Sequence, residues 1–238
     1  ELLKEGRYLL DAAHALERRV RRVATGIETD ISIAVSDLFN FEPMLNVLAD
    51  FYQQGLGTRV KLLREVYGGS WDALQSGRAD ISIGAPGDPP PGAGFATQLL
   101  GQLEFAFAVA PHHPLAALPE PLSASDIVQY RVVAAADSSR NLPPRTSGIL
   151  TGQDVLTVPD MQTKLQAQIS GLAIGYLPQG MAQAAAAQGQ LLIKQVSEPK
   201  PLAPVFIAWR QQRPSEMGKA MQWLLKACCG LSLSQLLN

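Results

Sequence analysis

The sequence contains few of the residues that build disulfide frameworks and metal sites. Among its 238 residues there are two cysteines, which are adjacent at Cys228 and Cys229, and three histidines. Neighbouring cysteines on one predicted helix cannot cross-link a fold, and no spacing of histidine, cysteine and carboxylate matches a metal-ligand set. We therefore expect no cofactor and no metal. Such sparse use of cysteine is typical of a reducing cytoplasm.

The sequence also lacks an excess of either charge and any long apolar run. Its formal net charge is -1 at pH 7, whereas a self-sufficient nucleic-acid-binding domain is usually strongly basic. No apolar stretch approaches the roughly 18 residues that a membrane span needs, and the N-terminal residues lack the apolar core of a signal peptide. We expect no membrane association and no specific binding of DNA by this chain.

Catalytic signatures are missing as well. The sequence has no G-x-S-x-G and no P-loop, and the glycines Gly92 and Gly94 follow a proline-rich loop rather than a strand. The adjacent His112 and His113 lie in a proline-flanked turn, where neighbouring side chains rarely face one ion. We therefore expect that the protein is not an enzyme.

What the sequence does contain begins with an amphipathic N-terminal segment. Residues 1–25 predict one long helix with the stepping of a coiled-coil seam, formed by Leu2, Leu9, Ala13, Leu16, Val20 and Val23. A lone helix cannot bury such a seam, so we expect a homodimer. The basic run from Arg18 to Arg22 is either a solvated helix end or a contact for nucleic acid. Because the sequence begins with Glu1 rather than Met, we expect a piece of a longer protein.

From Asp30 onward, short β-rich runs alternate with helical patterns. Strands and helices alternate first at residues 31–35, 43–54, 59–66, 70–75 and 79–84. This succession is typical of a parallel sheet with right-handed crossovers. A second βα set follows, and a late strand at 205–210 and a closing helix at 215–229 are left over. The simplest arrangement is an α/β fold of two lobes, with chain crossings near Gly101 and Ala203 and a hinged cleft between the lobes.

Loops at the carboxyl ends of strands supply the candidate binding residues, because ligands of open α/β sheets sit there. The predicted binding residues are Ser36, Asp37, Tyr67, Gly68, Gly69, Ser70, Gly84, Ala85, Pro86, Ser138, Ser139, Met161 and Gln162. Tyr67 or Trp71 would form an apolar wall, and the segment from Gly84 to Pro86 would line the floor. The alternative is ordinary turn and capping chemistry, which serine, aspartate and glycine perform in most proteins.

The charges beside these loops predict what the cleft holds. Asp37 and Asp72 lie close to the first two helix entries, where they would repel a carboxylate or a phosphate. On the other lobe we count only Arg140 and Arg145 as sources of positive charge, and solvation explains both equally well. We therefore expect a largely uncharged small molecule that is rich in hydrogen-bonding groups.

Three longer stretches resemble a known family. The runs LQSGRADISIGAP (74–86), LEFAFAVAPHHPLA (103–116) and ISGLAIGYLP (169–178) are similar to well-kept stretches of the sensing domains of LysR-type transcription regulators, in the same order and at similar intervals. The resemblance covers essentially the whole chain. It implies a two-lobed fold like that of type 2 periplasmic binding proteins, with a small-molecule effector held between the lobes.

The resemblance also implies a domain organisation. Residues 1–27 would be the linker helix that pairs between subunits, residues 28–101 and 204–238 lobe I, and residues 102–203 lobe II. The winged helix-turn-helix that contacts DNA would precede this chain and is absent from it. Such regulators are homodimers, and tetramers are common among them. DNA would be a partner only through the missing domain.

Within the family, VYGGSWDALQSGRADISIGAP (66–86) resembles the subgroup that includes regulators of purine and allantoin use. A purine base, a nucleoside or a ureide fits the uncharged ligand expected above. The alternative is a periplasmic solute-binding protein of the same fold. A solute binder has no use for a coiled-coil helix ahead of its first strand, so this helix favours the regulator.

Overall fold

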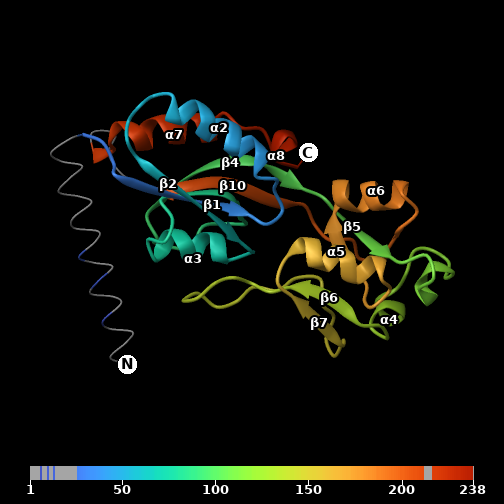
Figure 1. The fold of residues 1–238 in the computed structure, drawn as a ribbon. Coiled ribbons are helices and arrows are strands. Elements are labelled where there is room, and N and C mark those ends of the chain that lie inside the picture. Colours follow the sequence, from blue (N-terminus) through green and yellow to red (C-terminus); the bar gives the residue numbers. More distant parts are fainter. Residues whose placement is uncertain (1–5, 7–9, 11–12, 14–25, 212–215, 238) are drawn as a thin grey trace.

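The computed structural model describes residues 6, 10, 13, 26–211 and 216–237 (Figure 1). The predicted coiled-coil seam and the basic run from Arg18 to Arg22 therefore lie almost wholly outside the described residues. Within the described part, the chain forms two lobes that lie side by side in Figure 1. Each lobe has its own sheet or sheets, and helices cover them.

Lobe 1 is built on a five-stranded sheet in the order β2-β1-β3-β10-β4. The strands β1, β2 and β3 are parallel, as predicted, and β10 runs antiparallel between β3 and β4. Their bounds are Asp30–Ser36 for β1, Arg59–Glu65 for β2, Ile81–Pro86 for β3, Phe95–Leu103 for β4 and Ala203–Arg210 for β10. β1 and β3 are buried almost throughout because helices lie on both faces of the sheet.

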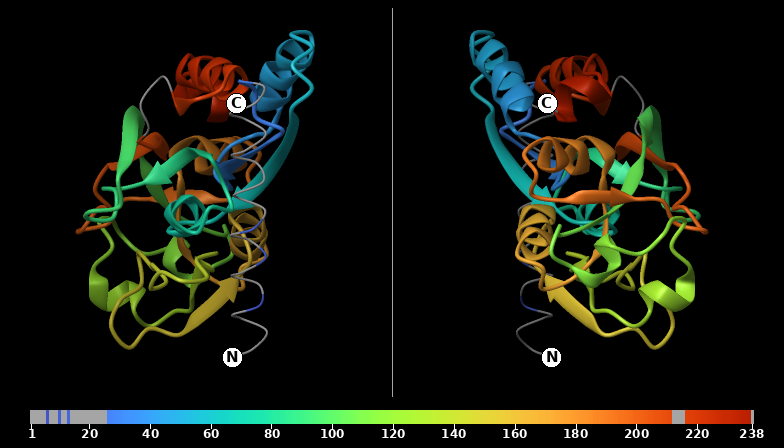
Figure 2. Two further views of the ribbon diagram at one scale, coloured as in Figure 1. Left: turned by 90° about the vertical axis from the view of Figure 1, so that its left-hand side faces the viewer. Right: turned by 90° about the vertical axis from the view of Figure 1, so that its right-hand side faces the viewer.

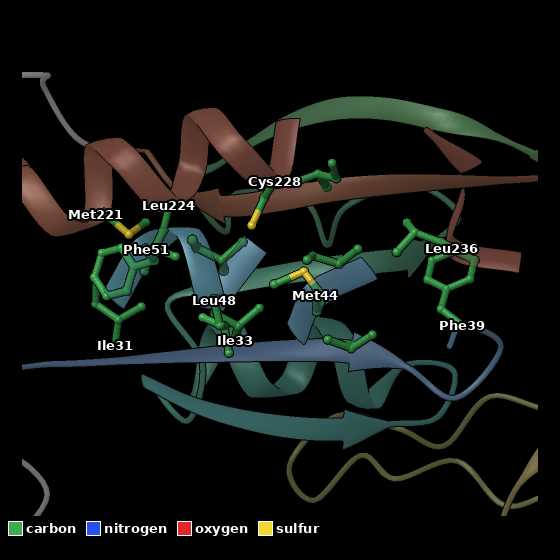
Figure 3. Packing of buried hydrophobic residues seen from close by; sticks show 14 of the residues in the cluster. Ile31, Ile33, Phe39, Met44, Leu48, Phe51, Met221, Leu224, Cys228 and Leu236 are labelled. Carbon is green, nitrogen blue, oxygen red and sulfur yellow. The ribbon is translucent and has the colours of Figure 1, made fainter. Parts of the chain in front are cut away.

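Helices pack on the two faces of this sheet because each presents an apolar stripe. Figure 2 shows α2 and α7 next to each other on one face, and α3 lies on the other face (Figure 1). The helices of this lobe are α2 (Glu42–Tyr52), α3 (Gly69–Gln75), α7 (Lys219–Cys229) and α8 (Leu233–Leu237). Figure 3 shows how α2 and α7 meet over β1 through buried side chains that include Met44, Leu48, Phe51, Met221, Leu224 and Cys228.

Lobe 2 consists of two small sheets and three short helices. β5 (Phe105–Val109) is the central strand of one sheet and runs antiparallel to both β8 (Gly175–Pro178) and β9 (Leu192–Lys194). The other sheet pairs β6 with β7 in parallel. The remaining elements are β6 (Val132–Ala135), β7 (Val155–Val158), α4 (Ala124–Ile127), α5 (Met161–Ile169), α6 (Gln179–Ala187) and a 3-10 turn at Pro114–Ala116.

The chain leaves the sheet of lobe 1 at Leu103 and returns to it at Ala203, close to the crossings predicted near Gly101 and Ala203. The segment between β6 and β7, residues 136–154, starts and ends in lobe 2 but extends beneath α3 of lobe 1 (Figure 1). The predicted bounds of the linker and of the lobes remain predictions. The two cysteines are free, and burial raises the pKa of the Cys228 thiol to about 12, which agrees with a packing role.

Candidate functional site

Ser138, which lies just after β6, joins lobe 2 to the end of β2 in lobe 1. Its hydroxyl accepts a hydrogen bond from the Val66 amide at 2.8 Å and donates one to Glu65 Oε2 at 2.5 Å. Its own amide donates to the Val66 carbonyl at 3.2 Å. A Cβ atom on Gly69 would lie 1.8 Å from Ser138 Oγ. The lobes approach this closely because position 69 has no side chain.

Asp137 fixes the same contact from the neighbouring position. Its carboxylate accepts hydrogen bonds from the amides of Gly68 at 3.0 Å, Ser139 at 2.7 Å and Arg145 at 2.7 Å. The Gly68 amide belongs to lobe 1 and the other two belong to the segment 136–154. Asp137 therefore holds this segment against the N-terminal end of α3.

Asp37 makes the second bridge between the lobes. It follows β1, and its carboxylate accepts a hydrogen bond at 2.9 Å from the amide of Met161, the first residue of α5. Burial raises the pKa of Asp37 to about 6, although the Met161 amide and Arg64 both act to lower it. The loop after β1 in lobe 1 therefore meets the start of α5 in lobe 2.

The raised pKa of Asp37 predicts a pH dependence of stability. Protonation favours the folded state when the folded pKa, about 6, exceeds the ordinary value of 3.8. This stabilisation is complete below pH 3.8 and is lost as the pH rises through 6. An asparagine side chain keeps an acceptor for the Met161 amide but does not titrate. The parent should therefore lose up to about 3 kcal/mol of unfolding free energy, relative to Asp37→Asn, when the pH is raised from 4 to 7. Urea unfolding of both proteins at pH 4 and at pH 7 measures this difference. Equal losses in the two proteins would contradict the prediction.

A buried charge network ties the segment 136–154 to α3. Arg78 forms ion pairs with Glu65 and, at 3.0 Å, with Asp72. The other oxygen of Asp72 accepts hydrogen bonds from the amides of Asn141 at 2.8 Å and Leu142 at 3.0 Å. Burial alone would raise the pKa of Asp72, but Arg78 and the loop amides outweigh it and hold that pKa below its usual range.

Further polar side chains gather around Tyr67, which has a backbone φ of 48° in the left-handed region. The side chain of Ser147 acts to lower the pKa of the Tyr67 hydroxyl, and Lys200 Nζ donates to Ser147 Oγ at 2.8 Å. Lys164 of α5 lies close enough to Lys200 and Asp37 for their charges to act on its ammonium group. Burial raises the pKa of Tyr67 and lowers those of Lys164 and Lys200 to about 8.

The predicted residues are not all brought together. The inter-lobe contacts include Asp37, Gly68, Gly69, Ser138, Ser139 and Met161. Within lobe 1, Ser36 is buried against Gly84, and the Ser70 hydroxyl is buried without a hydrogen-bond partner. Gln162, in contrast, is exposed on α5, away from the buried face that carries Lys164.

The segment from Gly84 to Pro86 belongs to the core of lobe 1 more than to an open floor. Ala85 and Trp71 are fully buried in the same cluster, and the Trp71 indole donates to the Pro86 carbonyl at 2.9 Å. Trp71 is therefore not the exposed apolar wall that the sequence allowed. Arg145 also donates to the Pro86 carbonyl, at 3.3 Å.

Two searches of the described residues bear on other functions. Among the described residues, there is no group of three or more histidine, cysteine, aspartate or glutamate side chains that could hold a metal ion. None of the helices in this part of the chain has the length and apolarity to cross a membrane.

The described residues form a two-lobed α/β fold whose lobes meet through polar loops at strand ends, the arrangement expected of a fold like that of periplasmic binding proteins. Residues 24–229 match the LysR substrate binding domain family. The chain belongs to this family, which confirms the resemblance that the sequence predicted.

Curated relatives and solved structures agree with this assignment. The uncharacterized HTH-type transcriptional regulator YeeY of Escherichia coli K12 is 42% identical over 211 residues, 89% of this chain and 68% of the relative. The HTH-type transcriptional regulator PunR of the same organism is 30% identical over 224 residues, 94% of this chain and 71% of the relative. The full-length regulator LysG of Corynebacterium glutamicum, with bound effector Arg, superposes with a TM-score of 0.62 at 18% identity, covering 99% of this chain and 78% of LysG.

These findings confirm the fold class and decide between the two functions kept open above. The chain is the effector-binding domain of a LysR-type transcription regulator rather than a solute-binding protein. Its relatives are transcription regulators, and such domains bind small-molecule effectors.

Proposed function

We propose that this domain senses a small metabolite between its lobes, at the loops that carry Asp37, Gly69, Ser138 and Met161. The observation that supports the proposal most is the direct bonding of these loops across the two lobes. A ligand that contacts both lobes stabilises the arrangement in which they meet, and it shifts the population toward that arrangement. The change in lobe position is the signal, and no catalytic step is needed.

We propose further that residues 1–27 pair two copies of the chain and carry this signal to a DNA-binding domain ahead of them. The coiled-coil seam in the sequence supports the homodimer. Tetramer formation by the full-length protein is proposed from the family, and a cytoplasmic location from the sparse use of cysteine. Contact with DNA would be made by the preceding domain.

The charges near the proposed site bear on the chemical nature of the effector. The sequence predicted a neutral, hydrogen-bond-rich molecule such as a purine or a ureide, and the 30% identity to PunR is compatible with that subgroup. Arg140 and Arg145, the two positive charges counted for this cleft, are both exposed. Lys164 lies near Asp37, and Lys200 binds Ser147 beside Tyr67.

The location of the site can be tested at Ser70. Its buried hydroxyl has no hydrogen-bond partner, so Ser70→Ala should cost the ligand-free protein little stability. If that hydroxyl contacts the effector, the variant should bind about 3-fold to 10-fold more weakly, the effect of one lost hydrogen bond. Calorimetric titration with adenosine, hypoxanthine, allantoin and a set of carboxylates would first identify a binder.

The matched control is Ser234→Ala, which removes an exposed hydroxyl on α8, far along the chain from these loops. A saturating binder should raise the unfolding free energy of the parent and of the control equally, by roughly 2.7 kcal/mol at a hundred times its Kd. Ser70 follows Gly69 at the start of α3, so equal affinity of the parent and Ser70→Ala for every binder would place the effector away from this end of the helix.

A further inference from the structure

Lys164 occupies a position where an ammonium group is poorly accommodated. It lies on α5, three residues after Met161, on the face of the helix that is buried. The residue is 3% exposed, and its burial lowers the pKa of the ammonium group to about 8. Burying a charge is unfavourable, and buried charges usually pair with an opposite charge or with a ligand.

Lys200 brings a second cation to the same place. Its Nζ donates to Ser147 Oγ at 2.8 Å and lies 3.9 Å from the centre of the Phe105 ring. A hydroxyl and an aromatic face orient the ammonium group but do not neutralise it. The charge of Lys200 acts to lower the pKa of Lys164, as expected for two cations near each other.

The described acidic groups do not balance these two cations. Asp37 is the carboxylate whose charge acts favourably on Lys164, and it already accepts the Met161 amide. Asp137 accepts three backbone amides, and Asp160 caps the start of α5 through the Thr163 amide at 2.7 Å. The site therefore has a local positive charge to offer a ligand.

We infer that the effector carries an acidic group, a carboxylate or a phosphate, which binds between the ammonium groups of Lys164 and Lys200. The inference rests on the proposed site between the lobes. Ser147, which accepts from Lys200, and Tyr67, whose pKa Ser147 acts to lower, supply hydroxyl donors to the same group. Asp37 is left to accept a donor from another part of the molecule. This assignment replaces the uncharged ligand that the sequence predicted.

Acids matched with uncharged counterparts test the inference directly. Calorimetry and thermal unfolding at constant ionic strength would compare nicotinate with nicotinamide, orotate with uracil and benzoate with benzamide, and would include inorganic phosphate. We expect at least one acid to bind about tenfold or more tightly than its neutral counterpart.

The lysine variants test the same inference from the side of the protein. Lys164→Met and Lys200→Met should each weaken the binding of the preferred acid by about tenfold to a hundredfold. Lys226→Met, which changes an exposed lysine on α7, should not. Stabilisation by phosphate but by no carboxylate would identify the acidic group as a phosphate.

The ligand-free protein provides a readout that does not depend on the choice of acid. Lys164→Met removes a charge from a residue that is 3% exposed and keeps the apolar length of the side chain, so the thermal unfolding midpoint should rise by about 3 °C. A lysine with a purely structural role would give a fall instead, and that result would overturn the inference. It also fails if no acid and no phosphate binds, or if both lysine variants bind the preferred acid as well as the parent. A neutral binder that is weakened by Ser70→Ala but not by Lys164→Met would reject the acidic group and leave the proposed site intact.

Discussion

Replacing Arg78 with methionine is expected to lower the free energy of unfolding by about 3–5 kcal/mol, as removal of one partner from a buried ion pair does. The side chain of Arg78 is 19% exposed, and those of its partners Glu65 and Asp72 are 4% and 1% exposed. Methionine fills a similar volume but leaves two carboxylates buried next to each other without a cation. Neither can move to solvent, because Glu65 is bonded to Ser138 and Asp72 to the loop amides.

Urea unfolding at pH 7 measures this effect, and the chain contains a matched control. Arg59 also pairs with an aspartate, Asp30, at 2.8 Å, but its side chain is 83% exposed. Arg59→Met should therefore cost no more than about 1 kcal/mol. Similar losses for the two variants would mean that the Arg78 network is screened by water and contributes no more than a surface pair.

The parts of lobe 1 that the sequence predicts well are those with a strong local pattern. β1 is a near-continuous apolar run between Asp30 and Asp37, and α2 has Pro43 in its first turn and apolar residues at helical spacing. The place of β10 between β3 and β4 could not be predicted, because strand order depends on pairing across more than a hundred residues of chain. The helix α8 is five residues long, too short for a periodic signal.

The candidate site shows the same division between local and distant information. The rule that ligands sit at the carboxyl ends of strands led to Asp37, Gly69 and Ser138, and the structure joins these loops across the lobes. Nothing local marks Lys164, which looks like one polar residue among several on α5. Lys200 stands in an irregular loop. Both become noticeable only when burial and the neighbouring charges are known, and these depend on the fold.

The closeness of the lobes at Gly69 leads to the last prediction. Alanine at this position would place its Cβ 1.8 Å from Ser138 Oγ and 2.7 Å from Glu65 Oε2. Both neighbours are held by the bonds that join the lobes, so the added methyl group must push Ser138 away and break those bonds. We expect Gly69→Ala to destabilise the protein by about 1–3 kcal/mol, the cost of overpacking. It should also weaken the binding of any effector that needs the lobes in contact by at least about tenfold.

Thermal unfolding, calorimetry and small-angle X-ray scattering would separate a wedge between the lobes from a local defect in α3. A wedge increases the radius of gyration, and removing the obstructing hydroxymethyl group should relieve it. The double variant Gly69→Ala/Ser138→Gly should therefore lose less stability than the two single changes added together.

The matched control is Gly180→Ala on α6, where nothing lies within 4 Å of the new Cβ. This change should be neutral or stabilising by up to about 1 kcal/mol, because alanine is the better helix former. If the two Gly69 and Ser138 changes were strictly additive, the methyl group would not act through Ser138, and the lobes would not be in contact at this point in solution.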